Sequence, residues 1–305
     1  MTIEPIQQLH LKRFYTDTNG SQVRAEIRAA NRAQTRPLKT FLTSIADFAD
    51  RAVHFQGRYA ARCGIDALST WARAGALLGK MPTKQGEHHR KWALTGLALS
   101  YLKLKPWTTL EDRNRINPWL QAMADDALVV FENPKIKRNN HLYWLGLALA
   151  AVGESTASDR HWDQAEAILD EALDGIPSSG MLPLEMARGA KALHYHVFAV
   201  TPLVVLEWLA RQSGRPVAST QRVALDRLID RTLEGVSDPF WFETTSGVPQ
   251  HLPSNRANFA GYGWPVLIDP DGTTRRQSLI LPNYAKSHRW LGGDIRTLLA
   301  AVKTR

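Results

Sequence analysis

Two polar segments carry the residue types most able to do chemistry: residues 139–144, which read NNHLYW, and residues 188–196, which read RGAKALHYH. Together they supply an amide, imidazoles, a guanidinium and a phenol. If both segments are helical, Arg188 and Tyr195 project from one face, being seven positions apart, and Asn140 and Trp144, four apart, share another. This set can neutralise a carboxylate and move the proton beside it. The spacing therefore indicates chemistry on an acidic carbohydrate.

Further blocks accompany these segments in a fixed order. They are WARAGAL at 71–77, RKWAL at 90–94, GMLPLEMARGAKALHYH at 180–196 and LGGD at 291–294. With the NNHLYW run, this pattern resembles the alginate (mannuronate) lyases of polysaccharide lyase family 5. The resemblance covers most of the chain and implies an all-α fold, an incomplete α/α toroid of antiparallel helix pairs with a long substrate cleft. It also implies β-elimination of 1,4-linked polyuronates without a cofactor or metal, on poly-β-D-mannuronate, polyglucuronate or hyaluronan.

The bond that such an enzyme breaks sets three tasks. The glycosidic oxygen at C4 lies beta to the C5 proton and the C6 carboxylate, so the carboxylate charge must be muted, the proton removed and the leaving oxygen protonated. We expect Asn140, His141 and Arg188 to bind the carboxylate. Tyr195 is expected to handle the protons, and His141 is the alternative base for a sugar whose C5 proton faces the opposite side. A free phenol has a pKa of about 10, so we expect Arg188 and a protonated histidine to lower that value.

Other residues are expected to bind the substrate around this centre. Trp144 follows Asn140 by one helical turn, which suits a sugar-stacking surface. The resembled lyases carry a lysine in an N-terminal lid, a place that Lys12 can take, and they have a tyrosine where this chain has Phe198, a difference that bears on substrate choice. The expected substrate-binding residues are Trp144, His194, Lys135, Lys191, Arg73, Tyr15 and Lys12.

The composition of the chain is consistent with an enzyme that acts on an acidic polysaccharide. The chain has 305 residues, 44% of them hydrophobic, a net charge of +9 and a pI near 9.8. It can bury a large core, and its positive field favours a polyanionic partner. The lone Cys63 excludes an internal disulfide and a cysteine-based zinc site. We expect a single domain over 1–305 that acts as a monomer on an anionic polysaccharide, without nucleic acid or membrane.

Helical periodicity dominates the chain. Apolar positions recur at three and four residues in 162–176, and similar patterns predict helices at 39–61, 64–79, 87–104, 115–131, 141–153, 184–211, 219–235 and 286–302. Residues 1–35 are expected to form an N-terminal arm or lid. Residues 236–285 are rich in Pro and Gly and are expected to form long loops near the cleft.

Two rival classes remain open at this point. A glycoside hydrolase on a similar toroid needs two carboxylates across the scissile bond, and only Glu185 stands in a suitable motif. A non-enzymatic polyanion-binding protein fits the basic charge, although no nucleic-acid-binding signature is present. The first residues, MTIEP, lack the layout of a signal peptide. Because the resembled family is exported, we expect a periplasmic or secreted protein whose signal has been removed.

Overall fold

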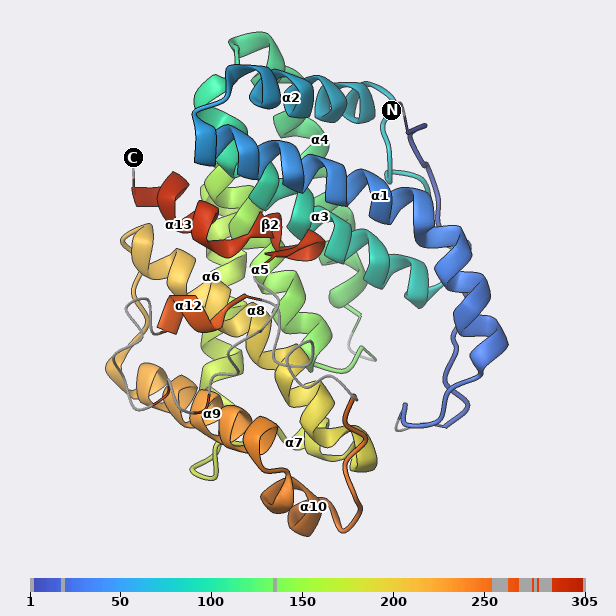
Figure 1. The fold of residues 1–305 in the computed structure, drawn as a ribbon, viewed down its shortest axis with the longest axis vertical. Helices are drawn as coiled ribbons and strands as arrows, with labels where there is room; N and C mark the ends of the chain where they lie inside the picture. Colours follow the sequence, from blue (N-terminus) through green and yellow to red (C-terminus); the bar gives the residue numbers. More distant parts are fainter. Residues whose placement is uncertain are drawn as a thin grey trace.

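Helices joined by short connections form the framework of this protein (Figure 1). The computed structural model describes residues 3–17, 20–133, 136–253, 263–268, 276, 279 and 287–303. The α-helices are α1 (Ala25–Phe55), α2 (Arg58–Arg73), α3 (Lys84–Leu104), α4 (Leu110–Phe131), α5 (Asn140–Thr156), α6 (Asp159–Asp174), α7 (Pro183–Met186), α8 (Ala192–Gln212), α9 (Ser219–Ser237), α10 (Phe240–Ser246), α12 (Pro265–Ile268) and α13 (Ile295–Lys303). Short 3₁₀ turns are η1 (Lys105–Trp107), η2 (Gly189–Lys191) and η4 (Arg289–Leu291), and β1 (Ser287–His288) pairs antiparallel with β2 (Gly293–Asp294).

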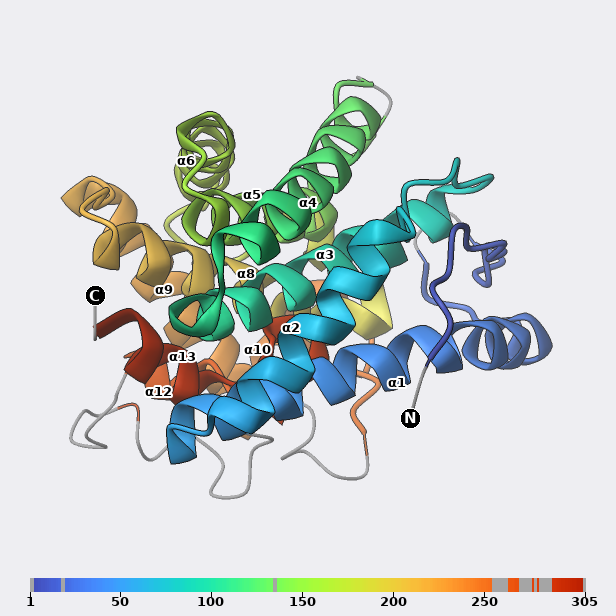
Figure 2. The same ribbon diagram turned by 90° about the horizontal axis from the view of Figure 1, so that it is seen from above.

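The helices form an inner and an outer layer. Helices α1, α3, α5 and α8 contact one another in chain order, and α2, α4, α6 and α9 pack outside them (Figure 2). Helices α3, α5 and α8 are buried on almost every side, which explains apolar runs such as LGLALAAV in α5. Helices α2, α6 and α9 bury one stripe only. This arrangement confirms the predicted all-α toroid.

Among the described residues, one helical stretch combines length with high hydropathy. Residues 189–212 could cross a membrane by length and composition alone, but 94% of the apolar window is buried inside the fold. Its apolar surface packs against α5, α9 and neighbouring elements. The stretch is therefore the central core helix of the toroid.

Several predicted boundaries were wrong. Helix α1 begins at Ala25 and contains Pro37, so only residues before Ala25 form an arm. The predicted helix 184–211 is interrupted by η2, where Gly189 has a φ of 56°. The predicted helix 286–302 begins instead with the β1–η4–β2 turn. The interval 236–285 begins inside α9 and contains α10 and α12; residues 254–262 and most of 269–286 lie outside the described residues.

A buried lysine fastens the C-terminal turn to the inner layer. Lys103 Nζ donates to Asp50 Oδ1 at 2.7 Å, to the Gly292 carbonyl at 2.7 Å and to the Asp294 carbonyl at 2.9 Å. Asp50 also accepts from the Asp294 backbone N–H at 2.8 Å. A buried charge needs such a full set of partners. The LGGD block of the sequence is therefore a structural clasp between α1, α3 and the C-terminal segment.

Candidate active site

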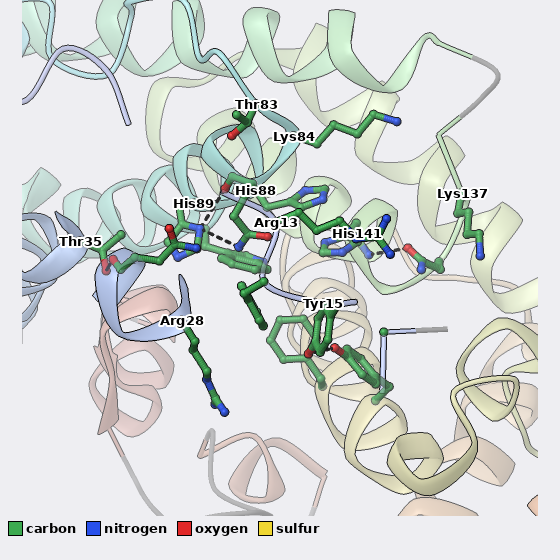
Figure 3. A pocket seen from close by; sticks show the side chains of 18 of the residues that line it. Arg13, Tyr15, Arg28, Thr35, Thr83, Lys84, His88, His89, Lys137 and His141 are labelled. Carbon is green, nitrogen blue, oxygen red and sulfur yellow. Dashed lines mark hydrogen bonds between the residues drawn. The ribbon is translucent and has the colours of Figure 1, made fainter. Parts of the chain in front are cut away.

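A cavity of about 790 Å³ opens at one end of the inner layer (Figure 3). Its walls come from the N-terminal parts of α3, α5 and α8, the first half of α1, Arg13–Tyr15 and Gly20 of the arm, and Trp290. Thr83 and Asn139 cap α3 and α5 through their side chains. Each helix N-terminus carries roughly half a positive charge, so three of them beside one cavity favour an anion.

The side chains of the wall strengthen this preference. Its charged members are all cationic: Arg13, Arg28, Arg32, Lys39, Lys84, Lys137 and Arg188. Among the described residues that line the cavity, none is Asp or Glu. A glycoside hydrolase needs two acids across the bond it cleaves, so this wall does not fit that rival class.

Two phenols meet at the cavity. Tyr195, in the first turn of α8 and only 7% exposed, has its hydroxyl oxygen 2.5 Å from the hydroxyl oxygen of Tyr15 on the arm. Figure 3 shows Tyr15 facing a second ring across this contact. Asp17 holds the arm by accepting from the backbone N–H groups of Ser21 and Gln22, each at 2.9 Å. The arm therefore brings a phenol to a helix 180 residues away in the sequence.

Arg188 completes this group by lying against Tyr195. Its Cζ is 3.6 Å from the centroid of the Tyr195 ring, and its Nη2 donates to the Gly20 carbonyl at 3.1 Å. Gly20 has a φ of 67°, which favours glycine, and a β-carbon there would lie 2.3 Å from that nitrogen and displace the guanidinium. Arg188 precedes η2 rather than lying in α8, so the predicted shared helical face was wrong. The turn nevertheless brings the guanidinium to the phenol.

The environment shifts the Tyr195 phenol away from ionisation. Burial and the neighbouring Tyr15 raise the pKa of Tyr195 above its ordinary value, and the opposing effect of Arg188 is smaller. The expectation that Arg188 gives a lowered phenol pKa was therefore wrong, because desolvation outweighs one nearby cation. Tyr195 is therefore a protonated phenol at neutral pH.

His141 is held between two residues of α3. Its ring stacks on that of His88 with centroids 3.6 Å apart, and its carbonyl accepts from Lys91 Nζ at 2.6 Å. Burial, together with His88 and Lys91, holds the pKa of His141 well below its usual range. His141 is therefore neutral at neutral pH, which corrects the expectation of a protonated histidine beside the phenol.

Several buried nitrogens at the cavity lack a hydrogen-bond partner. They are His88 Nδ1, His141 Nδ1, Arg188 Nε and Trp92 Nε1. Buried polar atoms in folded proteins are almost always paired, so a cluster of orphans on one cavity marks a place for a polar ligand. Donors of this kind suit the oxygens of a carboxylate or of sugar hydroxyls.

Asn140 lies behind the cavity wall, between Asn139 and His141. It is fully buried, and its side-chain Nδ2 and backbone N–H both donate to Glu185 Oε1 at 2.8 Å. Burial raises the pKa of Glu185, whose carboxyl sits at the start of α5. Asn140 is not among the residues that line the cavity, so its predicted contact with a substrate carboxylate stays a prediction. In the present geometry the amide positions Glu185 and the turn that carries Arg188.

The predicted substrate-binding residues divide into two groups. Tyr15 and His194 line the cavity, and Lys191 Nζ lies 4.9 Å from the centroid of the Tyr15 ring. Phe198 also lines it, beside Trp92 and Trp290. Lys135 lies outside the described residues.

One predicted contact was wrong, and two others stay predictions because their residues are exposed but lie outside the cavity wall. Trp144 is 0% exposed, and its indole N–H donates to the Phe198 carbonyl, so it is a core residue because α5 is surrounded by other helices. Arg73 is exposed at the end of α2, away from the cavity wall. Lys12 is exposed and is fixed through its backbone to Asn31, and the neighbouring Arg13 reaches the cavity instead.

Some residues that line the cavity were not predicted from the sequence. His88, Arg28 and Lys84 line the wall, but their positions in polar stretches give no signal beyond charge. His88 and His89 are adjacent in α3, and both rings contact Trp92 and line the cavity. Among the described residues, no group of three or more His, Cys, Asp or Glu is arranged to hold a metal ion.

Comparison with known proteins identifies similar chains. A sequence model of the family described as "Alginate lyase" matches residues 9–242. A polysaccharide lyase of Stenotrophomonas maltophilia is 39% identical over 85% of this chain and 78% of its own length. An alginate lyase of Pseudomonas fluorescens is 34% identical over 62% of this chain, which spans about half (53%) of that relative. A solved structure of alginate lyase A1-III complexed with tetrasaccharide matches 98% of this chain and 84% of its own, with a TM-score of 0.82 at 20% identity.

Proposed function

Because the chain belongs to the alginate lyase family, we propose that it is a polysaccharide lyase that cleaves alginate by β-elimination in this cavity. The observation that carries the proposal is the cluster of unpartnered buried nitrogens beside the Tyr15–Tyr195 pair, in a wall whose charged residues are all cationic. Such a wall attracts a polyuronate and excludes competing cations. The phenols supply the proton chemistry that elimination needs.

Binding of the uronate carboxylate comes first. Arg188 Nε and His141 Nδ1 are the donors placed to receive its oxygens, and the N-terminus of α5 adds its dipole. Withdrawing charge from the carboxylate makes the C5 proton more acidic and stabilises the enediolate that develops. A neutral His141 donates from one ring nitrogen without adding a charge that would need burial.

Proton transfer falls to Tyr195. Its phenolate takes the C5 proton, the C4–O bond breaks with its electron pair leaving on the glycosidic oxygen, and a C4=C5 double bond forms. The same phenol then protonates the leaving oxygen, so Tyr195 returns to the phenolate form. A raised pKa makes the phenolate scarce but strongly basic, which suits a weakly acidic carbon. Arg188 against the ring stabilises the phenolate while it exists.

This single-phenol route sets the substrate preference. In β-D-mannuronate the C5 proton and the C4 oxygen lie on one side of the ring, and glucuronate, which differs at C2, shares that geometry. In α-L-guluronate they lie on opposite sides, so one phenol cannot serve both. We therefore propose polymannuronate as the main substrate, with polyglucuronate and hyaluronan as secondary ones. Phe198 lines the wall with an apolar ring that makes no hydrogen bond to a sugar hydroxyl. It therefore restricts the arrangement of those hydroxyls less than a tyrosine would.

The test is to follow unsaturated product by ultraviolet absorbance on separate polymannuronate, polyguluronate, polyglucuronate and hyaluronan. The expected result is product from polymannuronate first and none from polyguluronate. Saturated products would instead indicate a hydrolase, and binding without product on every polymer would indicate a non-enzymatic polyanion-binding protein.

We also propose that the protein acts in the periplasm or outside the cell. Its proposed substrate is a large polyanion that does not cross a membrane unaided. Fractionation of cells producing the full-length gene product tests this, and recovery of the activity only with cytoplasmic markers would contradict it.

A further inference from the structure

A second hollow lies along α1, next to the main cavity. It has a volume of about 440 Å³ and is lined by Arg32, Arg36, Lys39, Thr40, Thr43, Ser44 and Arg289. Arg32 and Lys39 line the main cavity as well, so the two hollows share a border. We call the second hollow the α1 groove. A chain leaving the main cavity at this border would enter it directly.

The groove is built on one face of a helix. Arg28, Arg32, Lys39 and Thr43 recur at helical spacing, so their side chains leave α1 on the same side. At 1.5 Å of rise per residue, the eleven helical steps from Arg32 to Thr43 span about 16 Å. That length exceeds a single sugar ring, and the groove therefore suits a polymer rather than a small ion.

The opposite wall of the groove is Arg289, which is anchored firmly. A β-carbon on Gly96 would lie 2.1 Å from the Arg289 carbonyl, so η4 packs directly on the backbone of α3. The following Trp290 stacks on Trp92 with centroids 4.7 Å apart. The side chain reaches α1, where Nε donates to Thr43 Oγ1 at 3.2 Å. This hydrogen bond fixes the guanidinium, and no described residue accepts from its remaining N–H groups.

Within the described residues, the cations of the groove have no acidic partner. Arg32, Arg36, Lys39 and Arg289 form no ion pair with an acidic residue of the described chain, whereas Arg215 on the far layer contacts Asp163 and Glu166. Burial, Arg289 and Arg32 lower the pKa of Lys39, so these positive groups already repel one another. Keeping them together costs stability, and an anionic ligand would offset that cost.

We propose that the α1 groove is an auxiliary binding site for anionic polysaccharide, which holds uronate units beyond those at the reacting bond. The inference rests on the proposed function for the class of its ligand. Guanidinium groups of Arg36 and Arg289 bind carboxylates, and the hydroxyl groups of Thr40, Thr43 and Ser44 meet sugar hydroxyls. The groove raises affinity for long chains and leaves short oligomers unaffected, because these do not reach it.

The experiment compares long and short substrates with a double variant, Arg36→Gln with Arg289→Gln. Neither residue lines the main cavity. We expect kcat/KM on polymannuronate to fall about 3- to 10-fold, as for loss of two partly exposed ionic contacts, with the value on a mannuronate tetramer unchanged. The matched control, Arg58→Gln, removes an exposed arginine at the start of α2 and changes neither value.

A binding measurement separates this inference from the proposed function. Calorimetry with polymannuronate, on protein that also carries Tyr195→Phe, measures affinity while turnover is strongly slowed. Weaker binding of the polymer by the double variant supports the groove even if the unmodified protein yields no unsaturated product. Equal affinity with and without the two substitutions, or an equal loss on polymer and tetramer, would overturn it.

Discussion

At the level of single residues, two phenols and one guanidinium meet at the cavity. The Tyr15 and Tyr195 oxygens are 2.5 Å apart, and Arg188 covers the Tyr195 ring. Burial and Tyr15 together keep Tyr195 protonated at neutral pH. The rate of a reaction that uses its phenolate must therefore depend on alkaline titration.

This environment predicts the pH profile. Because the pKa of Tyr195 is raised, kcat/KM on polymannuronate should increase steadily from about pH 6 to pH 9, by up to tenfold per unit while the phenolate is the minor form. Because the pKa of His141 lies well below 6.5, that histidine should add no inflection near its usual value. Initial rates at low substrate concentration give the profile. A fall in kcat/KM above pH 7, with the protein still folded, would argue against a phenolate base.

The variant Tyr15→Phe sharpens the same prediction. Removing its hydroxyl takes away a contribution that raises the pKa of Tyr195, so the alkaline rise should move to lower pH. Tyr59→Phe is the control, since Tyr59 is 84% exposed on α2. An unchanged profile in Tyr15→Phe would mean that the short contact has no influence on the titrating group.

Part of this group of cavity residues could be predicted from the sequence. Tyr195, Arg188 and His141 were recognisable because they stand in short blocks with distinctive residue types. The contact between Tyr15 and Tyr195 and the stacking of His88 on His141 were not, since both depend on how distant elements pack. The direction of the Tyr195 shift also depends on burial, which spacing along one helix does not reveal.

At the level of elements, the clasp between α1, α3 and the C-terminal turn supports both walls of the α1 groove. Lys103 and Asp50 connect to the backbone of residues 292–294. Gly293 has a φ of 103°, and a β-carbon there would lie 2.3 Å from Asp50 Oδ2. This glycine is therefore required by backbone conformation and by space.

Substituting Gly293 should test the clasp. Gly293→Ala combines backbone strain with a clash and should lower the free energy of unfolding by about 3 kcal/mol. Gly214→Ala is matched for positive φ, at 74°, but meets no atom within 4 Å, so its loss should stay near 1 kcal/mol. Chemical denaturation measures both. Equal losses in the two variants would show that the contact with Asp50 contributes nothing.

Element boundaries were the weakest part of the sequence interpretation. Pro37 reads as a helix terminator, yet α1 runs through it, because the buried residues on either side, from Thr35 to Phe41, hold the helix against α3. Gly189 alone did not predict the 3₁₀ turn that separates Arg188 from α8. Tertiary packing determines the course of the backbone at both Pro37 and Gly189.

At the level of the whole molecule, buried neutral histidines couple folding to pH. His196 is fully buried within α8: its Nδ1–H donates to the Ala192 carbonyl, and its Nε2 accepts from the Leu182 N–H at 2.8 Å. Burial lowers the pKa of His196 to about 4. Protonation would remove the acceptor and place a charge in the core.

The sign of the effect follows from linkage. The unfolded chain binds the proton at pH values below about 6.5, while the folded chain does so only below about 4. The free energy of unfolding should therefore be fully retained above pH 6.5 and fall toward pH 4, by roughly 3 kcal/mol for this residue. Denaturant titrations at several pH values measure the slope. His196→Gln should flatten it, whereas His54→Gln, an exposed control on α1, should not; an unchanged slope in His196→Gln would refute the assignment.

The fold class was predictable from sequence because apolar residues recur with helical periods in most of the chain and because ordered blocks resemble a known family. Helical periodicity does not predict how the two layers of helices pack against each other. The cavity exists because the N-terminal turns of α3, α5 and α8 lie at the same end of the inner layer and the arm closes over them. That gathering of positive helix ends and cations explains at the molecular scale why an acidic polymer is the expected ligand.

The most direct test of the account is the yield of unsaturated product from polymannuronate by the unmodified protein and by Tyr195→Phe. Loss of the proton-transferring hydroxyl should lower kcat by about 10²- to 10⁴-fold, while calorimetry shows that the polymer still binds. Formation of unsaturated product by Tyr195→Phe at the unmodified rate would contradict the central role given to this phenol.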